Sequence, residues 1–451
     1  MPNIENTPSL VHLRAMSGYK IVVAALFGAA IWLIRLLIRE RSPKLDFPVM
    51  GSASDSEFSQ AVLKGFEKAN SPFIIPANPQ LVILPMSMYM ESKAHPAADV
   101  SAETNERFMG HWTRVQNTEI YSAIRQDLSK NLNIVLPLIQ DETKYAFKEL
   151  NIQSEWTSVN INSAMLRMIA LISGRVFVGS PLSRSEEWLD ASINYTRALS
   201  KVQDDYLGLG PVLSNIAAPF LSSYIPDAHK TATRVGEDQM IAILDLASRP
   251  QYIGELREEV ETVVAEEGEQ NEDGNIYLGK AAFAKMKKLD SFIKESQRFN
   301  SLAFVTPAYK LLSNATFSNG IKLPKGTRIT LLIRDLPGNA GPDVFDGFRY
   351  ARLRELPGLE SKHQAASTGL MCPRSKDNLT FGHGPHACPG RFFAIYEVKN
   401  LLVELLLHFD FRLAGTGDDR GQEAIRPANV AHKISNMPNP GAILEVRVRR
   451  A

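Results

Sequence analysis

Apolar residues recur every three or four positions along most of the chain after Ala97, which is the spacing of one buried helix face. This pattern predicts a body made mostly of helices. The predicted helices and their apolar faces are 124–132 with Ile124, Leu128 and Leu132; 252–266 with Leu256, Val260, Val263 and Val264; the helix before Arg298 with Met286, Leu289 and Ile293; and the helix after Cys388 with Leu401, Leu402, Leu405 and Leu406.

A few short runs have the composition of strands instead. Residues 73–75 and 81–84 are apolar and flank a turn at Asn78-Pro79, which predicts a hairpin. Residues 329–333 and 444–448 are also strand-like. The expected fold class is therefore mainly α with small β-sheets, an α+β arrangement.

The N-terminal region differs from the rest. Residues 21–34 form an uncharged apolar run, and after Arg35 the run continues to residue 38, which gives 18 residues, just enough to cross a thin bilayer. We predict an N-terminal tail at 1–20, an uncleaved transmembrane anchor at 21–38, a linker at 39–51 that contains prolines and a glycine, and one globular domain at 52–451. The alternative for 21–38 is a buried apolar helix.

The distribution of charge predicts which side of the membrane the body occupies, and the net charge argues against nucleic acid as a partner. More basic residues follow the predicted anchor than precede it, which favours a single-pass protein with its body in the cytosol. The net charge of +1 gives no basis for nucleic-acid binding. The chain has only Cys372 and Cys388, so a disulfide framework is not expected.

The strongest chemical signal lies in residues 381–394. Cys388 stands between Gly384 and Gly390, and Pro389 follows it directly, ahead of a long apolar helix pattern. Because proline suits the first position of a helix, we predict that Cys388 is the helix N-cap. Backbone N–H groups and the helix dipole favour a thiolate there, and a thiolate is a metal ligand.

The spacing Phe381-x-x-Gly384-x-x-x-Cys388-x-Gly390 resembles the haem-binding loop of the cytochrome P450 monooxygenases. The resemblance implies that haem b is the cofactor and that Cys388 is the axial ligand of its iron. It further implies that Phe381, Gly384 and Gly390 shape the haem-binding surface. Outside this loop, the likeness covers nearly the whole chain from Leu45 onward.

The same resemblance assigns further residues. Arg125 and His386 fall where the family places partners for the haem propionates. Glu295 and Arg298, three residues apart, match a pair that the family completes with a third residue, here Arg349, into a buried triad that fixes the cysteine loop. The alternative for the pair alone is a solvated surface ion pair.

The resemblance also implies an activity and partners. We expect oxygen from O2 to be inserted into an apolar small molecule, as in fungal members that oxidise terpenoids and other secondary metabolites. NADPH-cytochrome P450 reductase would supply the electrons, and the membrane would be that of the endoplasmic reticulum. Basic residues near the thiolate are candidate reductase contacts, although a solvated charged face is an equal alternative: Arg374, Lys376, Arg391 and Lys399.

One interval departs from the family. Only 17 residues lie between Asp227 and Asp245, where the family has a long distal helix that needs about 30 residues to span the domain. Residues for the proton-delivering acid–alcohol pair are not at the expected distance; the nearest are Thr231, Thr233, Glu237 and Asp238. A missing exon, a relative that has lost oxygen activation, and a rebuilt distal side are the three explanations. No catalytic residue is assigned.

Two other functions stay open at this point. The first is a non-catalytic haem-binding or scaffold protein, which the short distal interval favours. The second is a zinc-stabilised protein that uses Cys372, His383, His386 and Cys388, although His383-x-x-His386-x-Cys388 is tighter than the usual ligand spacing.

Overall fold

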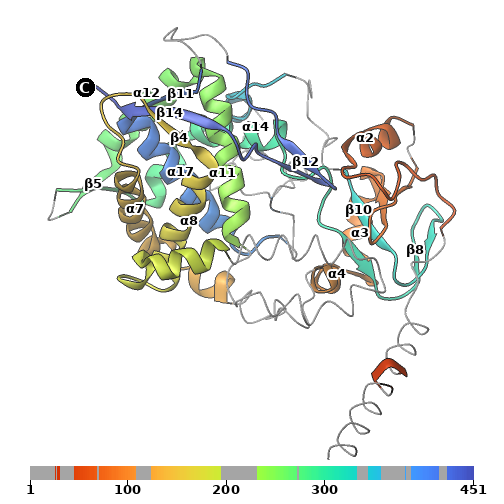
Figure 1. Ribbon diagram of the computed structural model, residues 1–451. Coiled ribbons are helices and arrows are strands. Elements are labelled where there is room, and N and C mark those ends of the chain that lie inside the picture. The colour runs from red at the N-terminus through yellow and green to blue at the C-terminus, as the bar shows by residue number, and fades with distance from the viewer. Residues whose placement is uncertain are drawn as a thin grey trace, which may run out of the picture. The chain divides into compact units, whose positions relative to one another are not determined.

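The computed structural model divides the chain into residues 1–44 and residues 45–451. The residues that it describes are Leu26, 28–30, 45–68, 71–107, 123–194, 231–271, 274–332, 344–356, Phe381, 387–415 and 424–450. The described residues of the second unit form helices and five small sheets, in agreement with the predicted mainly α fold with small sheets (Figure 1).

The largest sheet has five strands in the order β1-β2-β10-β7-β3. These strands are β1 (Phe73–Ile75), β2 (Leu81–Leu84), β3 (Ala98–Asp99), β7 (Tyr309–Leu311) and β10 (Arg328–Leu331). The antiparallel pairing of β1 with β2 confirms the predicted hairpin, and β10 confirms the strand predicted at 329–333 as far as Leu331. The pair β2–β10 is parallel and joins strands far apart in the sequence.

The other sheets are smaller. The three-stranded sheet has the order β11-β14-β4, and its strand β14 confirms the prediction for 444–448. Its strands are β4 (Thr157–Asn160), β11 (Phe409–Leu413) and β14 (Ile443–Val448). The three hairpins pair β5 (Gly268–Gln270) with β6 (Ile276–Leu278), β8 (Ala315–Thr316) with β9 (Lys322–Leu323), and β12 (Val430–His432) with β13 (Ser435–Met437).

The helices confirm three of the four predicted segments. The α-helices in the described part of this unit are α2 (Ser59–Lys68), α3 (Tyr89–Ala94), α4 (Val100–Arg107), α7 (Leu132–Glu149), α8 (Ile161–Phe177), α11 (Thr231–Ser248), α12 (Ile253–Glu267), α13 (Lys280–Lys285), α14 (Lys287–Phe299), α15 (Arg349–Glu355) and α17 (Arg391–His408). The predicted faces of α12, α14 and α17 are buried, except that Val264 is only partly buried.

The fourth prediction, one helix over 124–132, is wrong. Ile124–Leu128 is a single wide π-helical turn called η2, and α7 begins separately at Leu132. The N–H of Ser129 donates to the carbonyl of Ile124 at 3.1 Å, five residues back, which closes the wide turn. Apolar spacing alone does not distinguish this arrangement from a continuous α-helix.

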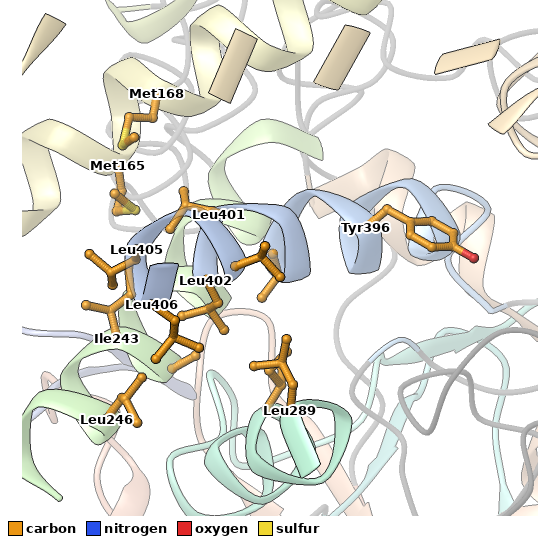
Figure 2. Packing of buried hydrophobic residues seen from close by; sticks show 14 of the residues in the cluster. Met165, Met168, Ile243, Leu246, Leu289, Tyr396, Leu401, Leu402, Leu405 and Leu406 are labelled. Carbon is orange, nitrogen blue, oxygen red and sulfur yellow. The ribbon is translucent and has the colours of Figure 1, made fainter. Parts of the chain in front are cut away.

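Helix α17 lies inside the main hydrophobic core. It lies among α7, α11 and α12 and contacts all three (Figure 1). Every residue from Phe393 to Leu406 is buried. Figure 2 shows its leucines directed toward Ile243 of α11, Met165 of α8 and Leu289 of α14. A helix surrounded by other helices needs apolar residues on more than one face, which explains why Leu401, Leu402, Leu405 and Leu406 occur within six residues.

Two charged side chains inside this core are paired. The ammonium group of Lys399 lies 2.6 Å from Oδ1 of Asp290 on α14, and it also donates to the carbonyl of Phe283 at 2.6 Å. Lys399 is 1% exposed, so the suggestion that it contacts a reductase is wrong. The pair fixes the rotation of α17 against α14, because removal of either partner leaves a buried charge.

Helix α11 contributes a second buried polar cluster. The carboxylate of Asp245 accepts hydrogen bonds from Asn300 at 2.8 Å and Arg249 at 3.0 Å, and it lies 2.8 Å from Nε of Arg426. These contacts join the C-terminal end of α11 to α14 and to the segment before β12. The helix has 18 residues, which corresponds to roughly 27 Å and falls short of the 30 residues that the family helix needs.

Most of the predicted transmembrane anchor lies outside the residues that the structure describes. Within 21–38 the structure describes only Leu26 and residues 28–30, all of them helical. Among the described residues, no helix has the length and apolar character that a membrane crossing requires. The anchor at 21–38 stays a prediction.

Glu397 on α17 is a buried acid with an incomplete set of partners. Its Oε1 accepts a hydrogen bond from the hydroxyl of Ser173 on α8 at 3.3 Å, and its Oε2 has no hydrogen-bond partner among the residues that the structure describes. Burial raises the pKa of Glu397 from 4.5 to about 8, and the bond from Ser173 only partly offsets this. The carboxyl group is therefore protonated in the native state at neutral pH.

This acid predicts a pH-dependent stability. Between pH 4.5 and about 8, the folded chain holds a proton on Glu397 that the unfolded chain has released. The free energy of unfolding should thus fall as the pH rises, by up to about 1.4 kcal/mol per pH unit from this group. Denaturant titrations at pH 5, 6, 7 and 8 give the free energy of unfolding at each pH. Its decrease with rising pH should be smaller for Glu397→Gln than for the unmodified chain. Equal decreases would contradict the raised pKa of Glu397.

Candidate functional site

The loop that ends at Cys388 closes on its own backbone. The N–H of Cys388 donates to the carbonyl of Phe381 at 2.7 Å, and this bond brings the two ends of residues 381–388 together. The side chain of Cys388 is half-buried and packs against the main core. Phe381 is buried at 4% exposure, and that its ring forms an apolar surface beside the sulfur stays a prediction.

The helix begins later than the sequence predicts. Gly390, and not Cys388, is the N-cap of α17, and Pro389 lies with Gly390 in a turn before the helix. The prediction that Cys388 is the N-cap is therefore wrong by two residues. The carbonyl of Cys388 still accepts from the N–H of Arg391 at 3.4 Å, so the cysteine adjoins the first turn and its N–H groups.

The residues after the cysteine form an apolar wall. Phe393 and Ala394 are both 2% exposed, and the ring of Phe177 from the end of α8 lies 5.9 Å from the ring of Phe393. Phe177 is itself 42% exposed. A half-buried thiol that is followed by apolar residues is suited to a large apolar group. A small hydrated ion would need more polar ligands.

The turn that carries Arg125 is joined to the cysteine loop. Arg125 is exposed on η2, and the hydroxyl of Ser129 at the end of this turn donates to the carbonyl of Pro389 at 3.3 Å. Arg125 and Cys388, which are 263 positions apart, therefore lie on segments in direct contact. Sequence reasoning does not find Ser129, since a single serine has no spacing signal.

The predicted triad is present. Arg298 donates to both carboxylate oxygens of the fully buried Glu295, at 2.8 and 2.7 Å, and Arg349 lies 3.4 Å from the same carboxylate. The N–H of Asp346 adds a bond to Glu295 at 2.9 Å. The carbonyl of Val344 accepts from both arginines, at 3.1 and 2.9 Å. The alternative of a solvated pair is excluded for Glu295, because its side chain is buried.

Other predicted positions fall outside the described residues: Gly384, His386, His383, Cys372, Arg374 and Lys376. Their assignments stay predictions, and so does the zinc alternative, which needs three of them. Within the described residues, no group of three or more His, Cys, Asp or Glu side chains is arranged to hold a metal ion.

Comparison with known proteins gives the family. A sequence model described as cytochrome P450 matches residues 239–432. A cytochrome P450 monooxygenase of Gibberella fujikuroi is 35% identical over 82% of this chain and 85% of its own length. The chain belongs to the cytochrome P450 family. Monooxygenases of Acremonium egyptiacum and Botryotinia fuckeliana are each 32% identical, over 91% and 96% of this chain and 92% and 98% of their own lengths.

Membership of the cytochrome P450 family implies a cofactor and a reaction class. The family binds haem iron through a cysteine thiolate, and the protein is an oxidoreductase of the monooxygenase type. Its reaction requires O2, a substrate and a redox partner. The half-buried thiol of Cys388, the buried ring of Phe381 and the exposed guanidinium of Arg125 are compatible with an iron ligand, an apolar wall and a propionate partner.

The alignments also bear on chain length. They extend over 501 and 513 residues for the Acremonium and Botryotinia proteins, which is longer than the whole 451-residue chain. The relatives therefore contain residues that have no counterpart here. This agrees with a shortened chain, and the placement of the loss between 227 and 245 stays a prediction.

The triad makes a prediction about stability. Glu295→Ala should lower the free energy of unfolding by about 3–5 kcal/mol, because it leaves the guanidinium groups of Arg298 and Arg349 without their carboxylate. Arg349→Ala should lower the free energy of unfolding by less, since Arg298 keeps its two shorter bonds to Glu295. Arg352→Ala on the same helix is the control, because its side chain is 60% exposed, and it should change stability by no more than about 0.5 kcal/mol. Equal losses for all three in urea unfolding would contradict this order.

Proposed function

We propose that Cys388 is the axial ligand of haem b in a monooxygenase that acts on an apolar small molecule. The observation that supports this most directly is the cysteine loop itself: a half-buried thiol, a 2.7 Å bond that closes the loop on Phe381, and the buried core helix α17 directly after it. When bound, the haem supplies the redox centre at which O2 is reduced and one of its atoms is transferred.

The protein residues hold and orient this group. Phe381 and Gly390 shape the apolar surface next to the sulfur, and Arg125 supplies a positive charge for a propionate. Gly384 and His386 complete the set that we assign to haem binding. The triad of Glu295, Arg298 and Arg349 braces α14 against the segment before α15, and its role is positional.

We further infer a membrane-bound protein of the endoplasmic reticulum, with residues 21–38 as a single-pass anchor and the body in the cytosol. The apolar run and the basic residues after it support this. Electrons would come from NADPH-cytochrome P450 reductase. The substrate class that we propose is a terpenoid or related secondary metabolite, which partitions into membranes and reaches an enzyme anchored there.

Substitution of the ligand tests the proposal. Cys388→Ser should weaken haem binding by more than roughly 100-fold, since even outer-sphere partners of a metal site are worth about 10–100-fold. The measurement is haem content together with the reduced, carbon-monoxide-bound absorption spectrum. Cys372→Ser is the matched control and should keep the red-shifted thiolate Soret band. An unchanged spectrum in Cys388→Ser would contradict the assignment.

A second candidate is a haem-binding relative that has lost oxygen activation. The 18-residue length of α11 and the surplus residues in the relatives favour it for the chain as written. A shortened distal helix would bury less apolar surface, and lost burial costs about 25 cal/mol per Å².

This candidate predicts a weakly stable holoprotein. Titration of the 451-residue chain with haem should give less than one equivalent bound and a free energy of unfolding below about 5 kcal/mol. Stoichiometric low-spin thiolate haem, followed by substrate turnover with a reductase, would reject it. The alternative is a missing exon near codons 229–233. Genomic DNA there would then encode an in-frame helix with an acid followed by threonine, and this would explain the missing residues of the distal helix.

A further inference from the structure

Side chains hold two neighbouring carbonyls at the cysteine. Nη1 of Arg391 donates to the carbonyl of Cys388 at 2.8 Å, and the hydroxyl of Ser129 donates to the carbonyl of Pro389 at 3.3 Å. Neither bond belongs to regular secondary structure. Together with the backbone bond to Phe381, they hold the peptide groups on both sides of the sulfur-bearing residue.

The guanidinium of Arg391 is engaged next to the cysteine. Its side chain is half-buried, its guanidinium carbon lies 4.4 Å from the ring centroid of Phe392, and Nη1 donates to the carbonyl of Cys388. A charge-assisted hydrogen bond at 2.8 Å is stronger than a neutral one. This contact makes Arg391 a component of the cysteine loop, whereas an open surface charge would be the expectation for a partner contact.

Ser129 connects the loop to a second segment. Its hydroxyl is shared between the carbonyls of Ile124, at 3.0 Å, and Pro389, at 3.3 Å. The residues between Ile124 and Ser129 form the π-helical turn that carries Arg125. Wide turns of this kind are frequent at functional sites. One hydroxyl thus sets the separation between the segment of the propionate partner and the segment of the thiolate.

We propose that Arg391 and Ser129 are positioning residues of the haem thiolate, an inference that rests on the proposed role of Cys388. Arg391 restrains the peptide after the sulfur, and its positive charge withdraws electron density from the ligand, which raises the reduction potential of the iron. Ser129 keeps the cysteine loop in register with the turn of Arg125. Neither residue touches the reacting atoms.

Three substitutions separate the two effects of Arg391. Arg391→Gln keeps a donor without the charge, Arg391→Lys keeps the charge with a single donor group, and Arg391→Ala keeps neither. We expect the midpoint potential of the haem iron to fall in the Gln and Ala variants and to stay near the original value in the Lys variant. Haem transfer to apomyoglobin should become about tenfold faster in the Ala variant, because a hydrogen bond to a charged group is lost.

Arg450→Gln is the control for Arg391→Gln, because it removes the same charge from an exposed position near the C-terminus. It should leave both the potential and the transfer rate unchanged. If Arg391→Gln and Arg391→Ala both match the unmodified protein in potential and in haem transfer, the role of Arg391 is rejected.

Ser129 is tested without haem, so the readout does not depend on a loaded enzyme. In a Cys372→Ser background, iodoacetamide alkylation of Cys388 in the haem-free chain reports how often the loop opens. Ser129→Ala should raise the rate about fivefold, which corresponds to one neutral hydrogen bond of about 1 kcal/mol. Ser129→Thr keeps the hydroxyl and should restore the slow rate. Ser158→Ala, at an exposed position of β4, should have no effect.

The outcomes distinguish the two levels of the proposal. If Cys388→Ser retains a thiolate-type spectrum, the proposed ligand is wrong and the positioning roles fall with it. If Cys388→Ser loses haem as expected, while the Arg391 and Ser129 variants match the unmodified protein, only the positioning roles are rejected. Equal alkylation rates for Ser129→Ala and the unmodified chain reject the role of Ser129 alone.

Discussion

The site depends on one constraint, which is that α17 is buried on all sides. The helix starts three residues after Cys388, so any rotation or shift of α17 moves the sulfur. Its leucines set its depth in the core, but apolar contacts alone tolerate small rotations. The ion pair of Lys399 with Asp290 removes that freedom, because a buried ammonium group must keep its carboxylate.

A second set of polar contacts braces α14, the helix that supplies Asp290. Glu295 gathers two arginines and a backbone N–H around it. The position of α17 is thus set by its apolar contacts and by the ion pair to α14. Arg391 and Ser129 act over a shorter range, at the peptide groups beside the sulfur.

Much of this arrangement could be predicted from the sequence, where the information is local or carried by a family motif. The faces of α12 and α14 have clear helical spacing, and the hairpin of β1 and β2 has a clear turn. The triad followed from the resemblance and not from spacing. The start of α17 was misplaced by two residues, because the Pro389-Gly390 pair forms a turn where proline alone suggested a helix.

What could not be predicted depends on partners that are distant in the sequence. The sequence alone suggests that Lys399 is a surface charge, because its partner Asp290 comes from another helix. Ser129 is an ordinary serine until Pro389 approaches it. Glu397 is an ordinary helix-surface acid by its residue type, and only the packing of α8 shows that it is buried and protonated. In each case tertiary contact overrides the local preference.

The parallel pairing of β2 with β10 has a consequence for synthesis of the protein. β2 ends at Leu84 and its partner β10 ends at Leu331, so the hairpin leaves the ribosome long before the strand that covers its free edge. At about 5–20 residues per second, this delay is roughly 10–50 s. During that time a fully apolar strand edge is available for association with other chains, and a chaperone that shields nascent β-edges would protect it.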